Sequence, residues 1–171
     1  MESEELLEVV DYKGNVIACV PRNAVHGDPS LMHRVVHVLV CNTRGDILLQ
    51  KRSMRKDVAP GKWDTSVGGH VGVGEDLLSS SKREMNEELG INGHEPEVLY
   101  SYIHSNKYET EMVTTFRCFC ESGFSFNREE IDDLRFWSRE EIERAMGTEI
   151  LSDNFEHEYR AYQGYLVNDV L

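Results

Sequence analysis

The segment from Gly69 to Ile91 reads GHVGVGEDLLSSSKREMNEELGI. Its first part, residues 69–74, contains three glycines, which allow a tight loop in which backbone groups approach a ligand closely. Residues 75–89 lack glycine and proline, and Gly90 follows them as a residue type that commonly ends a helix. The stretch therefore predicts a glycine-rich loop followed by a helix over 75–89.

Acidic residues dominate one side of this predicted helix. At about 100° per residue, one continuous arc holds Arg83, Glu84, Glu87 and Glu88. The packing face beside it holds Leu78, Ser81, Met85 and Leu89. The three carboxylates repel one another by a few tenths of a kcal/mol per pair, roughly. A divalent cation would offset this repulsion, and carboxylate oxygens are ligands that Mg²⁺ and Mn²⁺ prefer. A solvated acidic face is the alternative that composition alone favours.

The spacing of the whole stretch resembles the Nudix box, G-x5-E-x7-R-E-U-x-E-E-x-G-U, where U is a bulky aliphatic residue. All of the box's fixed positions match: Gly69, Glu75, Arg83, Glu84, Met85, Glu87, Glu88, Gly90 and Ile91. This resemblance implies an α/β (α+β) fold, the Nudix α/β/α sandwich, with a mixed central sheet flanked by helices. It also implies a Nudix hydrolase that uses Mg²⁺ or Mn²⁺ to cleave a diphosphate linked to another group.

The same resemblance implies roles for the matched residues. By position, the metal ligands would be Glu84, Glu87 and Glu88 together with the Gly69 carbonyl. Arg83 would complete the catalytic set by orienting the carboxylates, and Glu75 would brace the loop through Arg83. Metal ions lower the pKa of a bound water, so one glutamate needs only to accept the remaining proton. Glu87 is the candidate base, with Glu130 as a second candidate.

The flanking sequence, from about His26 to Trp137, resembles the isopentenyl diphosphate isomerase branch of the same family. There, two early histidines, the histidine after a Cys-Gly pair and the two glutamates of an E-x-E motif build a metal site. The corresponding residues here are His26, His33, His70, Glu109 and Glu111. Imidazoles and carboxylates together suit a divalent transition metal or Mn²⁺. The resemblance thus implies a second metal site, although any one of these histidines alone is more typical of a core or surface residue.

Gly68 and His37, near these five residues, do not follow the isomerase pattern. The cysteine that the isomerases use for proton transfer is replaced by Gly68, which has no side chain to move a proton. His37 has no role in the isomerase pattern and is predicted to be a core residue. We therefore expect a metal-dependent hydrolase of a small nucleoside diphosphate-X or other organic diphosphate compound. The alternatives are an isopentenyl diphosphate isomerase, which Gly68 disfavours, and a non-catalytic nucleotide-binding module.

Basic residues gather just before the box. Five of the 18 bases fall within residues 51–62. The isomerase resemblance places Lys51, Arg52 and Lys56 at the substrate diphosphate, and the planar fork of Arg52 suits phosphate oxygens best. An ordinary exposed basic loop is the alternative. Specificity is expected in the segments 57–63 and 104–109 and in the last helix. The aromatic candidates for stacking on a base are Tyr102, Tyr108 and Phe155, although residues of this type more often belong to the core or the surface.

Composition narrows the class of protein further. The 171 residues carry 18 basic and 31 acidic side chains, a net charge of −13, which disfavours a long nucleic acid or an acidic membrane as partner. No apolar run is long enough to span a membrane, and the first residues do not resemble a signal peptide, so a cytoplasmic location is expected.

The four cysteines form no CxxC pair and are predicted to be buried free thiols. Relatives that pair through sheet edges or the N-terminal segment also favour a homodimer.

The remaining pattern predicts one Nudix domain over 1–171. It would have an N-terminal hairpin and lead-in over 1–30, the box as a loop-helix-loop over 69–91 and a C-terminal helix over 150–171. Between these, a hairpin is expected from strands at 35–41 and 47–52. Further strands are predicted at 65–67, 98–104, 111–120 and 131–137, and a helix that begins after a capping box at Ser138.

Overall fold

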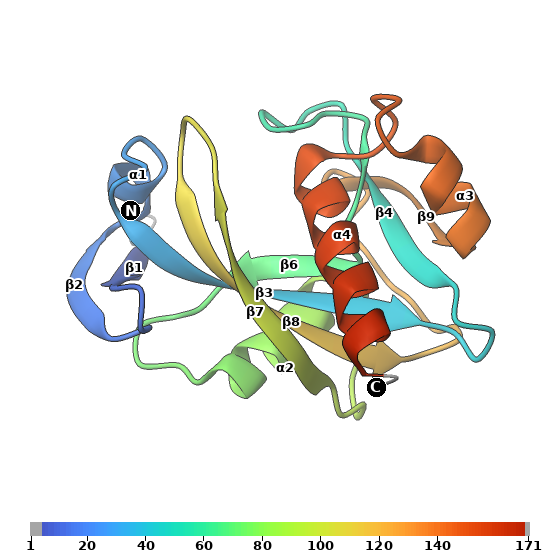
Figure 1. Cartoon of the computed structure of the whole chain (residues 1–171), viewed down its shortest axis with the longest axis horizontal. Helices are drawn as coiled ribbons and strands as arrows, with labels where there is room; N and C mark the ends of the chain where they lie inside the picture. The colour runs from blue at the N-terminus through green and yellow to red at the C-terminus, as the bar shows by residue number, and fades with distance from the viewer. Residues whose placement is uncertain (1–4, 170–171) are drawn as a thin grey trace.

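Two long strands, β3 (Met32–Cys41) and β8 (Thr110–Phe119), run parallel through the middle of a mixed sheet (Figure 1). The structure is a computed structural model that describes residues 5–169, so the ends of the predicted domain and C-terminal helix, 1–4 and 170–171, lie outside it. The other strands are β1 (Leu6–Val10), β2 (Val16–Pro21), β4 (Ile47–Arg52), β5 (Trp63–Asp64), β6 (Val67–His70), β7 (Glu97–Ser105) and β9 (Ile131–Trp137). The helices are α1 (Arg22–Val25), α2 (Leu77–Leu89), α3 (Arg139–Ala145) and α4 (Asp153–Asn168).

The sheet combines one parallel pairing with antiparallel ones. Strands follow the order β2-β1-β3-β4-β5, while β6 and β8 also pair with β3, β7 pairs with β8, and β9 pairs with β4. The predicted N-terminal hairpin is present as β1 and β2. The predicted hairpin of β3 and β4 is wrong in extent, because the two strands pair only at Cys41 and Ile47. β8 occupies one edge of β3 and β6 occupies the other over Val35–Val38, so β4 pairs with β9 instead.

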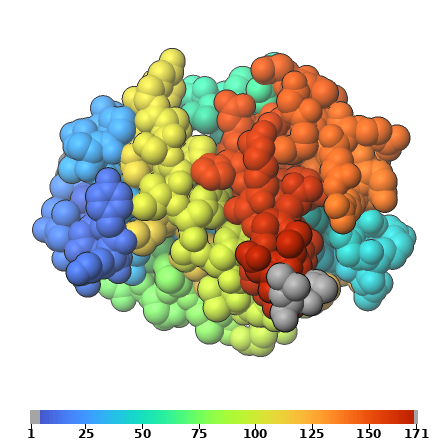
Figure 2. Space-filling view, viewed as in Figure 1, coloured from blue at the N-terminus to red at the C-terminus, as the bar shows by residue number. Residues whose placement is uncertain are grey.

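Helices cover both faces of the sheet, which confirms the predicted α+β sandwich. The alternation of side chains along β3 explains why both faces are apolar. Val36, Val38 and Val40 pack with Met85 of α2. On the opposite face, Leu39 and Cys41 pack with Phe155 and Tyr159 of α4. Figure 2 shows α4 on the surface between the β7–β8 hairpin and the segment that carries α3.

The box helix begins later than the sequence predicts. Asp76 caps its first turn by accepting a hydrogen bond from the backbone of Ser79 at 2.9 Å, so Glu75 lies in the loop. The helix ends at Gly90, whose φ of 66° is left-handed and favours glycine. Leu78 is 40% exposed and does not belong to the predicted packing face, because the helix rests on its Ser81, Met85 and Leu89 side.

Two smaller expectations meet different outcomes. The capping box at Ser138 is present and begins α3. All four cysteines are free, but Cys19 is exposed on β2, so the prediction of buried thiols holds only for Cys41, Cys118 and Cys120. Among residues 5–169, no helix is both long and apolar enough to cross a membrane.

Candidate functional site

Two adjacent glycines on β6 face opposite sides of the sheet and divide the site into two parts. A Cβ atom built on Gly69 would lie 2.1 Å from Cδ of Glu84, which is far too close for any side chain. Glycine at this position therefore admits the Glu84 carboxylate against the strand. On the other side, a Cβ built on Gly68 would meet the ring of His37 at 3.2 Å. The carboxylates of α2 thus gather on one face and a set of histidines on the other.

Arg83 holds the carboxylates on the α2 face. Its Nε and Nη2 donate to the two oxygens of Glu75 at 3.0 and 2.9 Å, a bidentate pair. Its Nη1 donates to Glu84 at 2.6 Å and to Glu87 at 3.2 Å, and Nη2 also reaches the carbonyl of His70 at 3.0 Å. This guanidinium lowers the pKa of Glu75 to about 2. The geometry is the orienting arrangement that the box resemblance implies for Arg83 and Glu75.

Glu88 is anchored by a residue that sequence reasoning missed. Gln50 of β4 donates to Glu88 at 2.9 Å and to the carbonyl of Ser66 at 3.0 Å. Gln50 is 38 residues away from Glu88, so only the pairing of β4 and the fold of α2 bring them together. Burial raises the pKa of Glu88 to about 7 and also raises the pKa of Glu84. Glu87, by contrast, keeps a side chain that is 56% exposed.

The residue types on this face suit a divalent cation, but Glu84, Glu87 and Glu88 do not bring three carboxylate oxygens within 4.8 Å of one another. Three carboxylates, those of Glu75, Glu84 and Glu87, contact the single guanidinium of Arg83, while Glu88 is bonded to Gln50 instead. The raised pKa of Glu88 reflects a buried carboxylate without a full counter-charge. A hard divalent cation would supply that charge to oxygen ligands.

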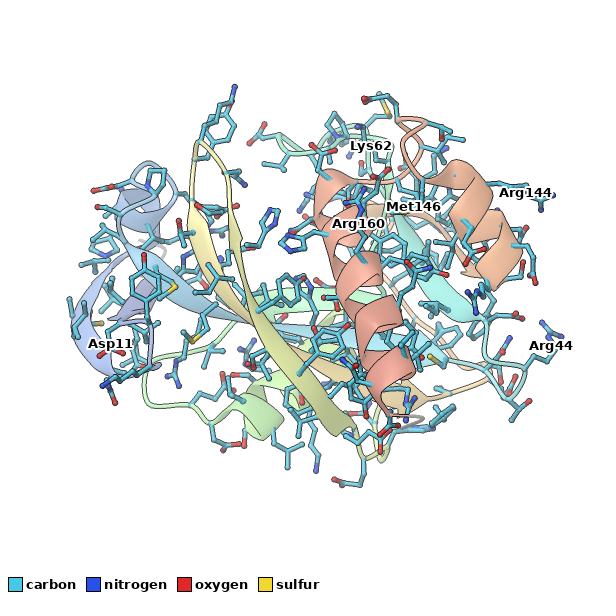
Figure 3. The ribbon with its side chains drawn as sticks, in the orientation of Figure 1. Asp11, Arg44, Lys62, Arg144, Met146 and Arg160 are labelled. Atoms are coloured by element: carbon cyan, nitrogen blue, oxygen red, sulfur yellow. The ribbon has the colours of Figure 1, made fainter. Side chains whose placement is uncertain are left out.

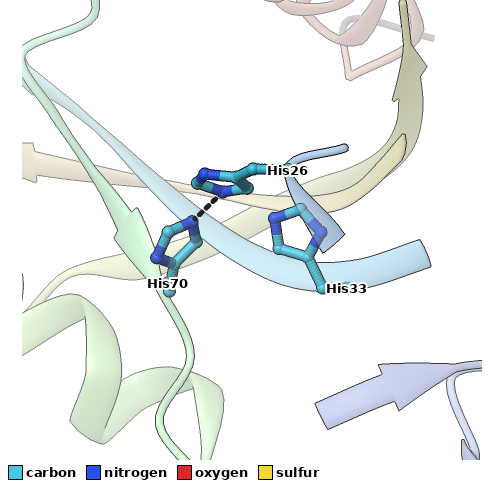
Figure 4. A group of neighbouring side chains, drawn as sticks. All are labelled: His26, His33 and His70. Carbon is cyan, nitrogen blue, oxygen red and sulfur yellow. Dashed lines mark hydrogen bonds between the residues drawn. The ribbon is translucent and has the colours of Figure 1, made fainter. Parts of the chain in front are cut away.

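Three histidines meet on the other face from separate parts of the chain (Figure 4). His26 follows α1, His33 lies on β3 and His70 ends β6. Nε2 of His26 and Nε2 of His70 are 3.2 Å apart, and the three rings have potential ligand atoms within 4.8 Å of one another. His33 is fully buried and neither ring nitrogen has a hydrogen-bond partner among the described residues. Burial lowers the pKa of His33 to about 3, which keeps it in the neutral form that binds metals.

The two predicted glutamates complete this cluster. Glu109 lies 3.3 Å from Nε2 of His26, and Glu111 lies 4.0 Å from Nε2 of His33. Oε2 of Glu111 is buried without a partner in the described chain, and burial raises the pKa of this carboxyl to about 7. The structure therefore brings together all five residues that the isomerase resemblance singled out. Buried, unpartnered nitrogen and oxygen donors fit a divalent metal of the kind that accepts both.

The basic segment at 51–62 is less available than the sequence suggests. Arg52 donates to the carbonyl of Val58 at 2.8 Å and pairs with Asp64 at 3.4 Å. Lys56 is paired with Glu130. Glu130, the second candidate for the general base, therefore lies on an exposed loop and is engaged by a lysine. The other two paired cations are Arg55, with Glu129, and Lys62, with Glu149 (Lys62 is labelled in Figure 3). Lys51 appears in no ion pair among residues 5–169, and it projects from β4 in register with Trp63.

Two of the three aromatic candidates for stacking are engaged within the protein. Phe155 is fully buried in the core beneath α4, so it is a core aromatic, the more common alternative for such a residue, and not a stacking residue. Tyr102 donates its hydroxyl to Glu158 of α4 at 2.8 Å. Tyr108, at the tip of the β7–β8 hairpin, is 58% exposed, with the ammonium of Lys107 4.8 Å from the centre of its ring.

Comparisons with known proteins agree with this architecture. The family described as NUDIX domain matches residues 31–157. The chain is 36% identical over 142 residues to an uncharacterised Nudix hydrolase of Yersinia pestis, covering 81% of this chain and 75% of the relative. It is 32% identical over 146 residues to an isopentenyl-diphosphate Delta-isomerase of Streptomyces avermitilis, covering 80% and 73%.

A solved structure shows the same fold. The protein DR0079 from Deinococcus radiodurans matches with a TM-score of 0.79 at 23% identity, over 92% of this chain and 98% of that chain. Because the sequence identity is low, this match shows a shared fold and not a shared activity. A Nudix hydrolase and an isomerase match the sequence at comparable identity, so overall similarity does not distinguish the two activities. Only the residues of the site can distinguish them.

Proposed function

The chain belongs to the Nudix hydrolase family, and we propose that it is a metal-dependent hydrolase of a small nucleoside diphosphate-X or other organic diphosphate compound. The observation that carries the proposal is the carboxylate set that Arg83 holds against Gly69. The presence of every fixed position of the box supports this proposal. We also propose that the whole chain forms a single Nudix domain.

The chemistry follows from the arrangement of this chain's own residues. Glu84, Glu87 and Glu88 would hold Mg²⁺ or Mn²⁺, with the Gly69 carbonyl as a further ligand. A bound divalent cation supplies Lewis acidity and lowers the pKa of a bound water. Glu87, whose carboxylate is the most exposed of the three, would accept the proton of the attacking water. Arg83 keeps the other carboxylates oriented while this happens.

We propose that the histidine cluster is a second metal site. Its ligands would be His26, His33, His70, Glu109 and Glu111. Support comes from the buried ring nitrogens of His33 and the buried oxygen of Glu111, which lack partners in the described chain. Buried polar atoms are seldom left unpaired, because each costs about 1–3 kcal/mol. A metal that accepts nitrogen and oxygen ligands would satisfy both residues at once.

Arg52, with Lys51 and Lys56, is the proposed grip on the substrate diphosphate. Arg52 and Lys56 would exchange their present carboxylate partners for phosphate oxygens, at small cost because such partly exposed ion pairs contribute about 0–1 kcal/mol. The net charge of −13 opposes a long polyanion, whereas a small diphosphate needs only local neutralisation by metal and these bases.

Isopentenyl diphosphate isomerisation is the second candidate, favoured by the complete five-residue cluster and by the similarity to the Streptomyces avermitilis isomerase. Gly68 weighs against it, because the isomerases carry their proton-transferring cysteine at this position.

One experiment separates these functions. The protein would be incubated with Mg²⁺ or Mn²⁺ and a panel of nucleoside diphosphate-X compounds plus isopentenyl diphosphate, with products identified by mass. The same panel is run with Glu88→Gln and with the control Glu140→Gln, which alters an exposed residue of α3. Release of a monophosphate that Glu88→Gln abolishes and Glu140→Gln retains supports the hydrolase. Dimethylallyl diphosphate as sole product contradicts it, and no turnover favours the binding module.

A further inference from the structure

Glu5, at the start of the described chain, contacts the histidine cluster from outside. Leu6 and Pro21 are paired in register across β1 and β2, which places Glu5 beside Arg22. The carbonyl of Glu5 accepts a hydrogen bond from the backbone of Arg22 at 2.9 Å. Its carboxylate reaches further, to Nδ1 of His70 at 3.2 Å. Glu5 lies outside residues 31–157, which match the Nudix family, so nothing in the box or its flanking strands indicated this contact.

The two ring nitrogens of His70 have different surroundings. Nε2 lies 3.2 Å from Nε2 of His26, inside the cluster. Figure 4 shows this nitrogen of His70 directed at His26 and the other nitrogen on the far side of the ring. That other nitrogen, Nδ1, is the one that meets Glu5. Two nitrogens on one tetrahedral zinc ion lie about 3.3 Å apart, so the spacing of the two Nε2 atoms suits a shared metal.

A carboxylate at Nδ1 determines which nitrogen of His70 is available to a metal. A carboxylate oxygen only accepts hydrogen bonds, so Nδ1 must donate and carries the hydrogen. A neutral imidazole has one N–H group, which leaves the lone pair on Nε2, on the side of His26. Histidines that bind metals commonly donate their second N–H to a carboxylate in this way, and that contact fixes the ring and strengthens the ligand nitrogen.

His70 is the one histidine of the cluster with such an outer carboxylate among residues 5–169. The nearest carboxylate to His26 is that of Glu109, which lies at Nε2, the nitrogen that faces His70. The ring nitrogens of His33 have no partner in this part of the chain, and its fully buried ring is fixed by packing. The side chain of His70 is 17% exposed, so packing constrains its ring less and a hydrogen bond has more effect on its orientation.

Arg22 keeps the carboxylate of Glu5 in place. Its Nη1 donates to Oε2 of Glu5 at 3.3 Å, while Oε1 is the oxygen that meets His70. Arg22 begins α1, and its carbonyl accepts a hydrogen bond from the backbone of His26 at 3.1 Å. Glu5 therefore connects the segment that carries His26 with the end of β6 that carries His70.

We propose that Glu5 is a positioning residue for the second metal site, where it holds His70 with Nε2 towards the metal. The inference rests on the second metal site proposed above and adds to it a carboxylate that does not bind the metal itself. The imidazole of His70 separates Glu5 from the ion, because the two occupy opposite ring nitrogens. A surface ion pair without this role is the alternative, and its loss would leave metal affinity unchanged.

The test is Zn²⁺ calorimetry on the full chain in excess Mg²⁺, because Mg²⁺ prefers the carboxylates of α2 and leaves the imidazoles to Zn²⁺. Loss of the carboxylate partner of a metal-binding histidine typically weakens affinity by roughly 10–100-fold, and we expect a loss in this range for Glu5→Ala. Glu5→Gln retains an acceptor oxygen and should lose less. The matched control Glu97→Ala removes another partly exposed carboxylate, one paired with Arg117, and should bind Zn²⁺ as the wild type does.

Two further measurements distinguish positioning from a general structural effect. In a His70→Ala background, Glu5→Ala should change Zn²⁺ affinity by less than about twofold, because the carboxylate acts through that ring. Imidazole ¹⁵N spectra of the wild type loaded with Zn²⁺ should show a hydrogen on Nδ1 of His70 and the metal on Nε2. These spectra do not depend on the folding of any variant.

The outcomes separate the role of Glu5 from the metal site itself. Equal Zn²⁺ affinity in Glu5→Ala and the wild type overturns the inference, as does a metal bound to Nδ1 of His70. In either case the second metal site stands and only the role of Glu5 falls. A wild type that binds no Zn²⁺ in excess Mg²⁺ overturns both, whereas cleavage of a diphosphate substrate by that same protein would still support the proposed hydrolase.

Discussion

Replacing Gly69 with alanine should separate metal binding from folding. The new Cβ would lie 2.1 Å from Cδ of Glu84 and 2.3 and 2.4 Å from its two oxygens. Carbon atoms in contact are normally about 3.5 Å apart, so the carboxyl group must retreat by more than about 1 Å. The obstructing atoms are the end of a flexible side chain and can move. We therefore expect a loss of stability near 1 kcal/mol, the lower end of the usual cost of overpacking.

The same displacement should affect the metal site far more. Glu84 would leave its 2.6 Å hydrogen bond with Arg83 and its place among the carboxylates. Ligands must hold their positions within about 0.5 Å for full affinity. Disturbing the groups that orient metal ligands typically costs 10–100-fold, so we expect a loss of about that size in Mn²⁺ affinity and in kcat/KM.

Calorimetric titration with Mn²⁺ and urea unfolding would measure both effects. The matched control is Gly164→Ala on α4, where an added Cβ meets nothing within 4 Å. It should leave Mn²⁺ affinity unchanged and raise stability by about 0.5–1 kcal/mol, because alanine favours a helix interior. Mn²⁺ affinity within twofold of the wild type in Gly69→Ala would refute the idea that Glu84 must occupy the space over this glycine to bind metal.

Three further predictions concern stability. The hydrogen bonds from Arg83 lower the pKa of Glu75 to about 2 from an ordinary value near 4.5. The stabilisation that ionised Glu75 gives to the folded state is therefore fully present above pH 4.5 and is lost as the pH falls towards 2. In urea unfolding, Glu75→Gln should therefore lower the free energy of unfolding by about 2 kcal/mol at pH 7 and by little at pH 2.5. An equal loss at both pH values would contradict the predicted direction of this pH dependence. EDTA should lower the melting temperature of the wild type and of the control His94→Leu by more than that of His33→Leu, which can lose metal only from the carboxylate site of α2. An EDTA effect in His33→Leu as large as in the wild type would count against the second metal site. Glu158→Gln should lower the free energy of unfolding by about 3 kcal/mol, since it leaves His37 buried without its partner charge, and a change below about 1 kcal/mol would show that the pair is not ionised.

The elements that sequence patterns predict well are those in which the pattern is local. The capping box at Ser138 and the helix end at Gly90 follow from residues within one turn. The start of the box helix was misplaced because Asp76 competes for the capping role just after Glu75. The prediction that β4 pairs with β3 along its length is also wrong, because β4 pairs with β9. The sequence of a strand does not indicate which edge of a neighbouring strand another strand already occupies.

The histidine cluster shows a different limit. Resemblance to the isomerases indicated which residues to consider, and the structure brings His26, His33 and His70 within reach of one another. Nothing local in the sequence requires this, because the three lie on separate elements. The basic segment illustrates the reverse: its charges suggested an open phosphate grip, yet Arg52 and Lys56 each have an acidic partner that comes from elsewhere in the chain.

Sequence patterns alone establish the family, the fold class and the carboxylate face of α2. Those features depend on spacing within 23 consecutive residues, and the helical period converts that spacing directly into a shared face. Tertiary structure alone decided that Gln50 anchors Glu88 and that Glu158 supports His37, 121 residues away. Such pairs depend on strand register and on how α4 docks, and these emerge only when the sheet and its helices pack together.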